Sequence, residues 1–521
     1  MRGARRRLAA VAACLLLLSQ GCGSRRDAPD LVLITVDTLR ADRLGAYGHD
    51  GANTPVFDGL AERGRLFTQA TTPFPRTTPA LASLFTGLEP RRHGSREVAE
   101  PRRFGTTLAE VLLARGYATI GVSSNGVAGA HENLHTGFEI FREKEDLGTE
   151  RGWKVTDTAL ELTLRVPAER PLFLWAHYTD PHYTYNPPRD FDPGPEADAC
   201  RDLMSAVKAR TVFKGQMQAN HGGATAPVVP ACALLYDAEV AYADTQVGRL
   251  LAGLGRAGRL DRAYVIYTSD HGENLGESKL FFEHGPSVHD ASLRVPLAIT
   301  GPDVARGRDA GLIRLQDLAP TLLSLAGVPP GERPEGDALD LASRVRGDGD
   351  SAPSVALAEG ATNMRVRYTA RPQSGRPDDR YCFHDAPWSL CLEPNAAPAL
   401  YDHQADPGLT RDVGDAHPEV RERILAAGRS WTPGELRERT ARTADWKLVE
   451  YPRLEGGWRR ELYALASDPG ETRDVAAQYP EELERLAAEL ERWAATPLPA
   501  SGLSNSDLEA LRALGYVDET D

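Results

Sequence analysis

Five short, almost continuously apolar segments constrain the fold of this chain more than any other feature of its sequence. Each is five or six residues long, and such runs are typical of strands that are covered on both faces. Between them lie segments in which apolar residues recur with helical spacing. This alternation predicts an α/β fold with a mostly parallel, mixed central sheet between layers of helices. The strand candidates are residues 31–36, 118–123, 172–177, 263–268 and 295–299, and the helix candidates are residues 54–64, 79–86, 106–115 and 234–254.

The 521 residues exceed what one small core can bury, and the pattern divides them into two domains. Residues 30–345 hold the alternating segments, interrupted at 183–232 by an insertion with little regular pattern. Residues 346–521 are expected to form a smaller α+β domain, because a unit of 33 residues occurs there twice. The copies, 399–431 and 461–493, are identical at 15 of 33 positions. Each copy predicts a strand, an Asp-Pro-Gly turn and a helix.

The N-terminus has the features of an export signal. Four arginines precede an apolar stretch from Leu8 to Leu18, which is too short to span a bilayer as a helix. The residues before Cys22 resemble a bacterial lipoprotein processing site. We therefore expect residues 1–21 to be a signal peptide of the lipoprotein type, with ordinary cleavage nearby as the alternative. The mature protein is then periplasmic, anchored to a bacterial envelope membrane by a lipid on Cys22.

Charge and cysteine content narrow the function classes further. A formal net charge of −14 argues against a nucleic-acid-binding protein that neutralises phosphates. Besides Cys14 and Cys22 the chain has four cysteines, and an even number in an exported chain predicts disulfides. Three pairings are possible, and the sequential one closes the shortest loops. It joins Cys200 to Cys232 and Cys382 to Cys391.

Two of the strand candidates end in side chains that bind metals. Asp37 follows the strand 31–36, and Asp270 and His271 follow the strand 263–268. Ligands bind at the carboxyl ends of strands in open α/β sheets, so we expect these three side chains to share one divalent cation. Mixed carboxylate and imidazole ligands favour zinc or manganese, with calcium as a weaker alternative.

A helix start supplies a candidate nucleophile. Thr77 and Thr78 precede Pro79, which suits the first turn of a helix. Free N–H groups at a helix N-terminus attract anionic groups. Taken alone, this pattern is typical of an ordinary helix cap. In the same way, Glu273 and Glu277 are expected in the first turn of a helix.

A series of motifs occurs along the chain, beginning at Val36, Thr77, Leu84, His93, Asp180, Thr268, Leu293, Asp317 and Leu462. Together they resemble the sulfatase-like branch of the alkaline phosphatase superfamily, which implies an alkaline-phosphatase-like fold. The nucleophile position is Thr77, which cannot be converted to formylglycine, and the arginine position of the family's motif is Leu81. The chain therefore resembles the threonine-nucleophile members, namely phosphodiesterases, phosphonate hydrolases and phosphoethanolamine transferases.

The chemistry expected of this set centres on Thr77. Asp37, Asp270 and His271 bind the cation, with the Thr77 oxygen as a further ligand. The cation lowers the pKa of the hydroxyl, which attacks phosphorus or sulfur and forms a covalent ester that water hydrolyses. Asn125 is expected to bind the substrate by donating to one of its oxygens, and Asp180 is the second candidate for substrate binding.

The remaining candidates concern the leaving group and a second ion. His182 and His284 are expected either to neutralise charge on the leaving oxygen or, with Asp180, to hold a second metal, so one or two ions are expected. Read singly, these side chains, like His177, are more typical of loop or surface residues.

Three functions follow from these features. The first is an exported, metal-dependent hydrolase that cleaves a phosphate, phosphonate or sulfate ester of a small, glycan-linked or lipid-linked molecule. The second is a phosphoethanolamine-type transferase that acts on an envelope acceptor, because the segment 270–285 resembles the transferase pattern. The third is a catalytically inactive binding protein on the same fold.

Overall fold

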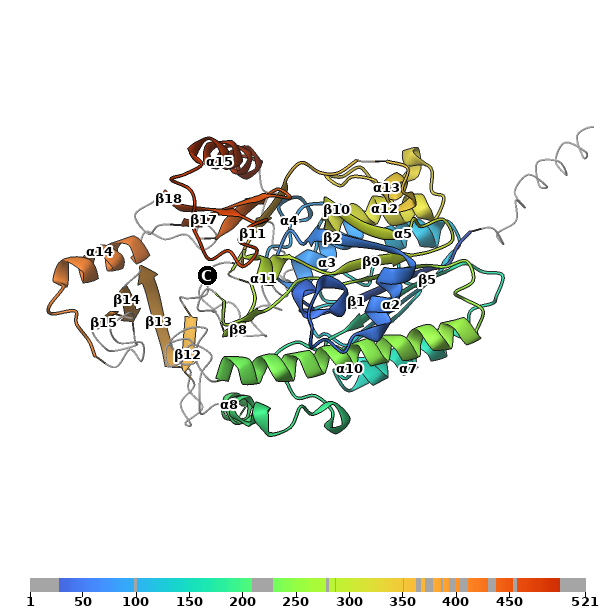
Figure 1. Cartoon of the computed structure of the whole chain (residues 1–521), viewed down its shortest axis with the longest axis horizontal. Helices are drawn as coiled ribbons and strands as arrows, with labels where there is room; N and C mark the ends of the chain where they lie inside the picture. The colour runs from blue at the N-terminus through green and yellow to red at the C-terminus, as the bar shows by residue number, and fades with distance from the viewer. Residues whose placement is uncertain are drawn as a thin grey trace, which may run out of the picture.

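A computed structural model of the chain contains a large α/β domain with two small antiparallel sheets beside it (Figure 1). Among the helices that it describes, none is long and apolar enough to cross a membrane. The predicted signal peptide and Cys22 lie outside the described residues. The structure describes residues 28–97, 101–208, 228–277, 281–285, 287–349, 351–361, 367–370, 378–385, 388–392, 399–402, 411–429, 437–452 and 457–496.

The central sheet has eight strands in the order β10-β2-β9-β6-β1-β5-β3-β4. Every neighbouring pair is parallel except the two that include β9. The predicted mixed, mostly parallel sheet is therefore confirmed. The strands are β1 (Leu31–Val36), β2 (Arg65–Thr71), β3 (Ala118–Ser123), β4 (Ile140–Arg142), β5 (Leu172–Tyr178), β6 (Tyr264–Thr268), β9 (Leu297–Thr300) and β10 (Gly307–Arg314).

Helices cover both faces of this sheet because successive side chains of each strand point to opposite sides. In β1, Val32 and Ile34 belong to the core shared with α2, α7 and α10. Leu31 and Leu33 belong to the core shared with α3, α5 and α12 on the other face (Figure 1). The helices are α2 (Pro55–Arg63), α3 (Thr77–Thr86), α5 (Leu108–Ala114), α7 (Gly152–Thr163), α10 (Val228–Arg256) and α12 (Leu318–Leu325), with the shorter α4 (Pro90–His93), α6 (Lys144–Leu147), α11 (Asp290–Leu293) and α13 (Ala342–Arg346).

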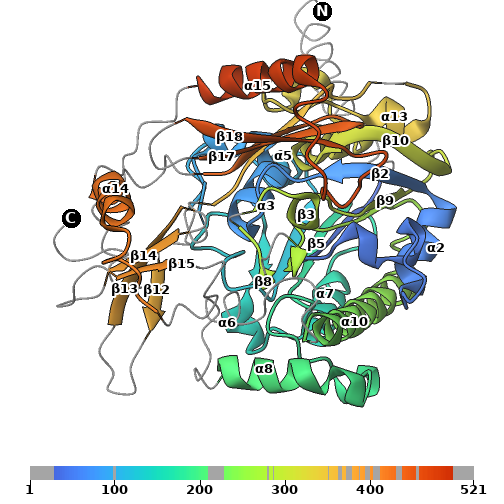
Figure 2. The ribbon, with the colours of Figure 1, turned by 60° about the vertical axis from the view of Figure 1, so that its left-hand side comes forward.

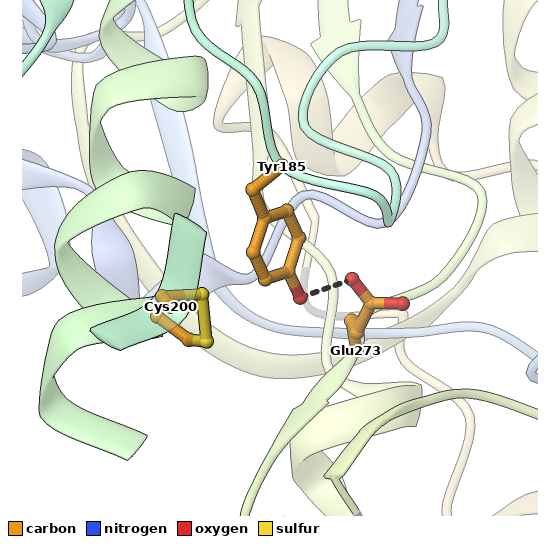
Figure 3. The surroundings of a disulfide bond; sticks show 4 residues. Tyr185, Cys200 and Glu273 are labelled. Atoms are coloured by element: carbon orange, nitrogen blue, oxygen red, sulfur yellow. Dashed lines mark hydrogen bonds between the residues drawn. A yellow bond between two sulfur atoms is a disulfide. The ribbon is translucent and has the colours of Figure 1, made fainter. Parts of the chain in front are cut away.

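The insertion is more regular than its sequence predicts. The helix α8 (Asp198–Lys208) lies within it, and α10 begins six residues before the predicted start at residue 234. Cys200, Leu203 and Met204 of α8 are buried against the core, which explains why this short, mostly polar segment is helical. The predicted disulfide between Cys200 and Cys232 is present and joins α8 to α10 (Figure 3).

Two four-stranded antiparallel sheets form the C-terminal part (Figure 2). The first copy of the repeat contributes β15 and α14, and the second contributes β18 and α15, so the copies lie in different sheets. Cys382 and Cys391 are register partners on β13 and β14, but their side chains are outside the described part. The elements are β11 (Ala356–Glu359), β16 (Arg439–Arg442), β17 (Trp446–Pro452) and β18 (Trp458–Ala464) with α15 (Pro480–Ala494), and β12 (Arg367–Ala370), β13 (Asp378–Asp385), β14 (Trp388–Leu392) and β15 (Ala399–Asp402) with α14 (Pro418–Arg429).

Buried ion pairs attach the first of these sheets to the α/β domain. The Lys447 ammonium on β17 is fully buried, 2.8 Å from Asp290 of α11 and 2.7 Å from Glu471. Arg442 also pairs with Asp290, at 3.1 Å. A buried charge is stable only with such partners. Charges from the C-terminal sheet therefore hold α11 in place.

Candidate active site

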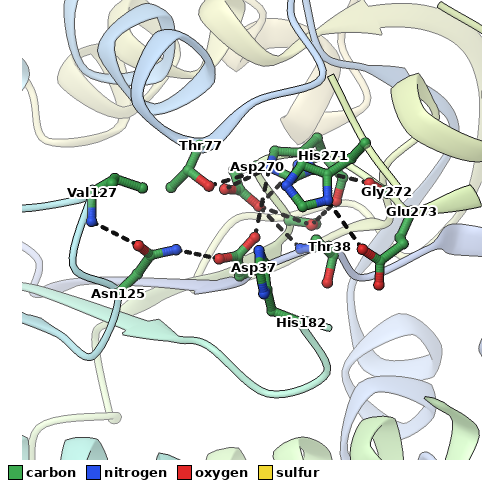
Figure 4. Close-up of polar contacts among 12 residues, drawn as sticks. Asp37, Thr38, Thr77, Asn125, Val127, His182, Asp270, His271, Gly272 and Glu273 are labelled. Atoms are coloured by element: carbon green, nitrogen blue, oxygen red, sulfur yellow. Dashed lines mark hydrogen bonds and ion pairs between the residues drawn. The ribbon is translucent and has the colours of Figure 1, made fainter. Parts of the chain in front are cut away.

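The predicted site residues meet at the carboxyl ends of adjacent strands (Figure 4). Asp37 follows β1, Asp270 and His271 follow β6, and Asn125 follows β3, while α3 begins at Thr77. Together with β5, these strands are consecutive neighbours in the sheet, in the order β6-β1-β5-β3. The parallel direction of the strands thus gathers side chains that are more than 200 positions apart.

Asp37, Asp270 and His271 form one cluster in which no side chain is exposed. Nε2 of His271 lies 3.6 Å from Oδ1 of Asp37 and 3.5 Å from Oδ2 of Asp270. Oδ1 of Asp270 accepts the backbone N–H of His271 at 2.9 Å. Burial, with a further contribution from the charge of Asp270, raises the pKa of Asp37 well above its ordinary value. Two carboxylates in this position need a cation or a proton between them.

His271 presents a lone pair to this cluster. Its Nδ1 lies 2.9 Å from the carbonyl oxygen of Gly272, which can only accept, so we assign the ring hydrogen to Nδ1. Burial lowers the pKa of His271, although the charge of Asp270 opposes this effect. A neutral ring with its hydrogen on Nδ1 turns an unprotonated Nε2 toward the two acids.

Four buried polar atoms around the cluster have no hydrogen-bond partner among the described residues. Such atoms are rare in folded proteins and indicate a missing partner such as an ion. Ligand atoms of Asp37, His177 and Asp270 all lie within 4.8 Å of one another. The residues present therefore fit the divalent cation that the sequence predicts. The four atoms are Oδ1 of Asp37, Oδ2 of Asp270, Oγ1 of Thr38 and Nε2 of His177.

His177 is a potential ligand that the motifs did not single out. It lies on β5 in register with Thr35 of β1, and its Nδ1 is 2.8 Å from the Thr35 hydroxyl. That hydroxyl also accepts the indole N–H of Trp175 at 2.9 Å, so the ring is held in one orientation. The only signal in the sequence was a histidine at the end of the strand candidate 172–177, because its proximity to Asp37 depends on the pairing of β5 with β1.

Thr77 reaches the cluster from the other side. Its hydroxyl oxygen lies 3.2 Å from Nε2 of His271, and the residue is 3% exposed. The adjacent Thr78 donates its hydroxyl to the carbonyl of Val127 at 2.7 Å, which holds the start of α3 against the loop after β3. The first N–H groups of a helix have no partner within it. The threonine hydroxyl therefore lies where an anionic group can bind beside a cation.

Asn125 orients Asp37. Its side-chain N–H donates to Oδ2 of Asp37, and its oxygen accepts the backbone N–H of Val127 at 2.8 Å. An asparagine amide has two N–H bonds, so one remains for the substrate oxygen that the sequence predicts. The amide is thereby fixed from both ends before any substrate binds.

Glu273 has a different place from the predicted first helical turn. It lies before the short strand β7 (Asn274–Leu275), which pairs with β8 (Phe281–Glu283), and it is fully buried. Its carboxylate accepts the Tyr185 hydroxyl at 2.6 Å (Figure 3) and lies 3.0 Å from Nδ1 of His284. A carboxylate only accepts, so Nδ1 of His284 carries a hydrogen and Nε2 is the position at which this ring exchanges a proton.

His284 stands beside the other histidines, whereas Asp180 does not join them. The ring centre of His284 is 4.6 Å from that of His271 and 4.9 Å from that of His182. The Asp180 carboxylate instead accepts the backbone N–H of Gly152 at 2.9 Å, and Arg151 lies 3.5 Å away. Within the described part of the chain, the contacts of Asp180 do not support a second metal.

A family model described as Sulfatase matches residues 29–328. The chain belongs to the sulfatase family. It is 30% identical to arylsulfatase A of Homo sapiens over 78% of this chain and 88% of that protein. It is 26% identical to an arylsulfatase of Clostridium perfringens over 60% of this chain and 77% of that protein.

Solved structures agree with this membership at the level of the fold. The phosphonate monoester hydrolase of Agrobacterium radiobacter is similar over 94% of this chain and 97% of its own, with a TM-score of 0.59 and 20% identity. The sulfatase-family chain described here is accordingly a hydrolase of sulfuric or phosphoric ester bonds.

Proposed function

We propose that this protein hydrolyses an anionic sulfate, phosphonate or phosphate ester with Thr77 as the nucleophile and a divalent cation as cofactor. One observation carries the proposal. The Thr77 hydroxyl lies 3.2 Å from Nε2 of His271, which in turn lies within 3.6 Å of unpaired carboxylate oxygens of Asp37 and Asp270. A hydroxyl, two acids and a neutral imidazole converge on one point.

Asp37, Asp270 and His271 would hold the cation, with His177 as a further ligand. When bound, it supplies a Lewis acid that makes the alkoxide of a nearby hydroxyl available near neutral pH. Two carboxylates with imidazole nitrogens favour zinc or manganese over calcium, which prefers oxygen ligands. We propose a single ion, since the contacts of Asp180 lie elsewhere.

The residues of this chain then act in sequence on the ester. The N-terminal N–H groups of α3 and the free N–H of Asn125 orient the anionic group. Thr77 attacks the sulfur or phosphorus atom in line and forms a covalent ester. His284, whose Nδ1 is held by Glu273, gives the leaving oxygen a proton from Nε2 and then takes one from the water that cleaves the Thr77 ester. Formylglycine chemistry has no starting residue here, because it requires cysteine or serine.

We also propose an exported protein with a lipid on Cys22. The arginines and the apolar stretch before Cys22 support this location. A periplasmic environment is consistent with the disulfide between Cys200 and Cys232. Substrates there include small molecules and glycan- or lipid-linked esters.

A panel assay tests the proposal. The mature chain, loaded with zinc, manganese or calcium, is incubated with nitrophenyl sulfate, nitrophenyl phenylphosphonate, nitrophenyl phosphate and a phosphodiester that carries a nitrophenyl group. We expect turnover of at least one ester and a loss of about 10³-fold or more in Thr77→Ala, because a covalent route loses its nucleophile. Full activity of that variant removes Thr77 from the mechanism. Product that appears only with an added acceptor identifies a transferase, and a chain without bound metal or turnover is a binding protein.

A further inference from the structure

Arg76 carries a guanidinium that the protein itself does not neutralise. The side chain is only partly exposed, its Nε is buried, and it has no hydrogen bond or ion pair among the residues that the structure describes. The contrast with Arg40 is clear, because that buried guanidinium contacts Asp42 at 2.7 Å and Glu277 at 2.8 Å. A cation partly withdrawn from water without a counter-charge is unfavourable unless a ligand supplies the charge.

The position of Arg76 places this charge beside the proposed nucleophile. Arg76 is the extended residue that immediately precedes α3, so it is joined by one peptide bond to Thr77. Its guanidinium lies against Gly285, where an added Cβ would be 2.3 Å from Nε and 2.6 Å from Cζ. Gly285 follows His284, whose ring centre is 4.6 Å from that of His271. The lack of a side chain at residue 285 leaves room for the guanidinium next to the site.

No arginine stands at the position where the family's motif carries one. Leu81, which stands at the arginine position of the family's motif, is fully buried in the apolar core and supplies no cation. Arg76 precedes Thr77 in the sequence, whereas the family's arginine position, residue 81, follows it.

The net charge of the site determines which charge on the substrate's reacting group it can balance. Asp37 and Asp270 together balance one divalent cation, and the carboxylate of Glu273 is already in contact with His284 and Tyr185. One positive charge, that of Arg76, remains. A guanidinium donates through a planar fork that matches two oxygens of a sulfuryl or phosphoryl group.

We propose that Arg76 binds non-bridging oxygens of the scissile group and that its single charge selects esters whose reacting group carries one negative charge. Sulfate monoesters, phosphonate monoesters and phosphodiesters have that charge, whereas phosphate monoesters carry two near pH 8. This inference rests on the proposed function, because it names the substrate class of the same site.

Binding to a chain without the nucleophile tests it directly. Metal-loaded Thr77→Ala is titrated in a calorimeter with methyl sulfate and with methyl phosphate, which differ by one charge at pH 8. We expect methyl sulfate to bind at least tenfold more tightly than methyl phosphate. Adding Arg76→Gln to this chain should weaken its affinity for methyl sulfate by about 10²-fold, because charged hydrogen bonds are lost. Adding Arg76→Lys instead should retain part of the affinity.

Controls separate this inference from general damage and from the proposed function. Arg306→Gln removes an exposed arginine and should leave methyl sulfate affinity unchanged. The role of Arg76 is overturned if Arg76→Gln leaves the affinity for methyl sulfate unchanged, or if Thr77→Ala binds no methyl sulfate. The charge selection is overturned if methyl phosphate binds more tightly than methyl sulfate. If the wild type hydrolyses esters in these cases, the proposed function survives alone. If it hydrolyses none while methyl sulfate binding still depends on Arg76, only the proposed function fails.

Discussion

The hydroxyl of Thr77 lies 3.2 Å from Nε2 of His271, although 194 positions separate the two residues in the chain. Thr77 begins α3, and His271 lies beyond the end of β6. Both side chains are buried, so the packing of α3 against the segment that follows β6 fixes their approach. Side chains held by packing in this way keep reacting groups close to the geometry that the reaction needs.

Conservative changes at Thr77 should separate chemistry from packing. Thr77→Ser keeps the hydroxyl and should retain activity within about tenfold, whereas the isosteric Thr77→Val should lose about 10³-fold or more in kcat/KM. Intact-protein mass spectrometry of a quenched reaction should detect a substituted Thr77 in the wild type and a substituted serine in Thr77→Ser. Equal activity of the valine and serine variants would falsify the covalent route.

Metal removal should destabilise the protein in a pH-dependent way. Without a cation, burial and repulsion from Asp270 raise the folded pKa of Asp37 above its unfolded value. A raised pKa gives a contribution to stability that is present at low pH and is lost as pH rises through the folded value. The melting temperature of the chelated protein should therefore fall from pH 5 to pH 8, and added zinc or manganese should restore it most at pH 8.

Asp270→Asn is the matched variant for this experiment. This variant removes the repulsion between residue 270 and Asp37, and it also removes a charged ligand of the metal. The chelated variant should therefore melt at a higher temperature than the chelated wild type at pH 8. It should also gain little from added metal and bind less than one ion per chain by elemental analysis. A variant that binds metal like the wild type would place the cation elsewhere.

The strands and the principal ligands were predictable because they depend on local patterns. A run such as residues 31–36 identifies a buried strand by itself, and the acid that follows it must lie at the carboxyl edge of the sheet. The prediction of β1 and β3 was therefore correct to the residue. Polar side chains at these ends, such as Asp37 and Asp270, are identifiable from the amino-acid sequence alone.

Residues whose role depends on contacts distant in sequence were not predictable. Glu273 has the local sequence of a helix start, and only the approach of Tyr185, 88 positions away, makes it a buried acceptor. His177 looks like an ordinary strand residue until β5 pairs with β1. Arg76 carries no local signal of a role, because the space that Gly285 leaves for its guanidinium exists only in the folded chain.

Glu273 should act through His284. Glu273→Gln replaces the carboxylate beside Nδ1 with a neutral amide, so a smaller fraction of His284 should carry the proton that the leaving group needs. The loss in kcat should be about tenfold for a nitrophenyl ester, which needs little protonation, and about 10³-fold for an alkyl ester. Tyr185→Phe, which removes one bond to Glu273, should show the same dependence with smaller losses. Equal losses on both leaving groups would indicate a purely structural role.

The disulfide between Cys200 and Cys232 should stabilise the insertion. It closes a loop across 32 positions, for which loop entropy gives about 3–4 kcal/mol. Cys232 lies one helical turn before Tyr236, whose ring centre is 5.6 Å from that of Tyr185. Cys200→Ser should lower the melting temperature under oxidising conditions, and a reductant should lower the melting temperature of the wild type by more than that of Cys200→Ser. A melting temperature that no reductant changes would contradict the stabilising role.

The pH dependence of stability should also report on Glu239. Burial, followed by the charge of Asp180, raises its pKa to about 8, and its carboxylate accepts the backbone N–H of Asn186 at 2.7 Å. The folded pKa exceeds the unfolded value of about 4.5, so the protonated form favours the folded state. Between the unfolded and folded pKa values, ionisation of Glu239 should lower the free energy of unfolding of the wild type by up to about 1.4 kcal/mol per pH unit. Glu239→Gln keeps the acceptor for Asn186 and removes the titration, so its melting temperature should exceed that of the wild type increasingly from pH 5 to pH 8. A difference between the two proteins that stays constant over this range would show that Glu239 is ionised throughout.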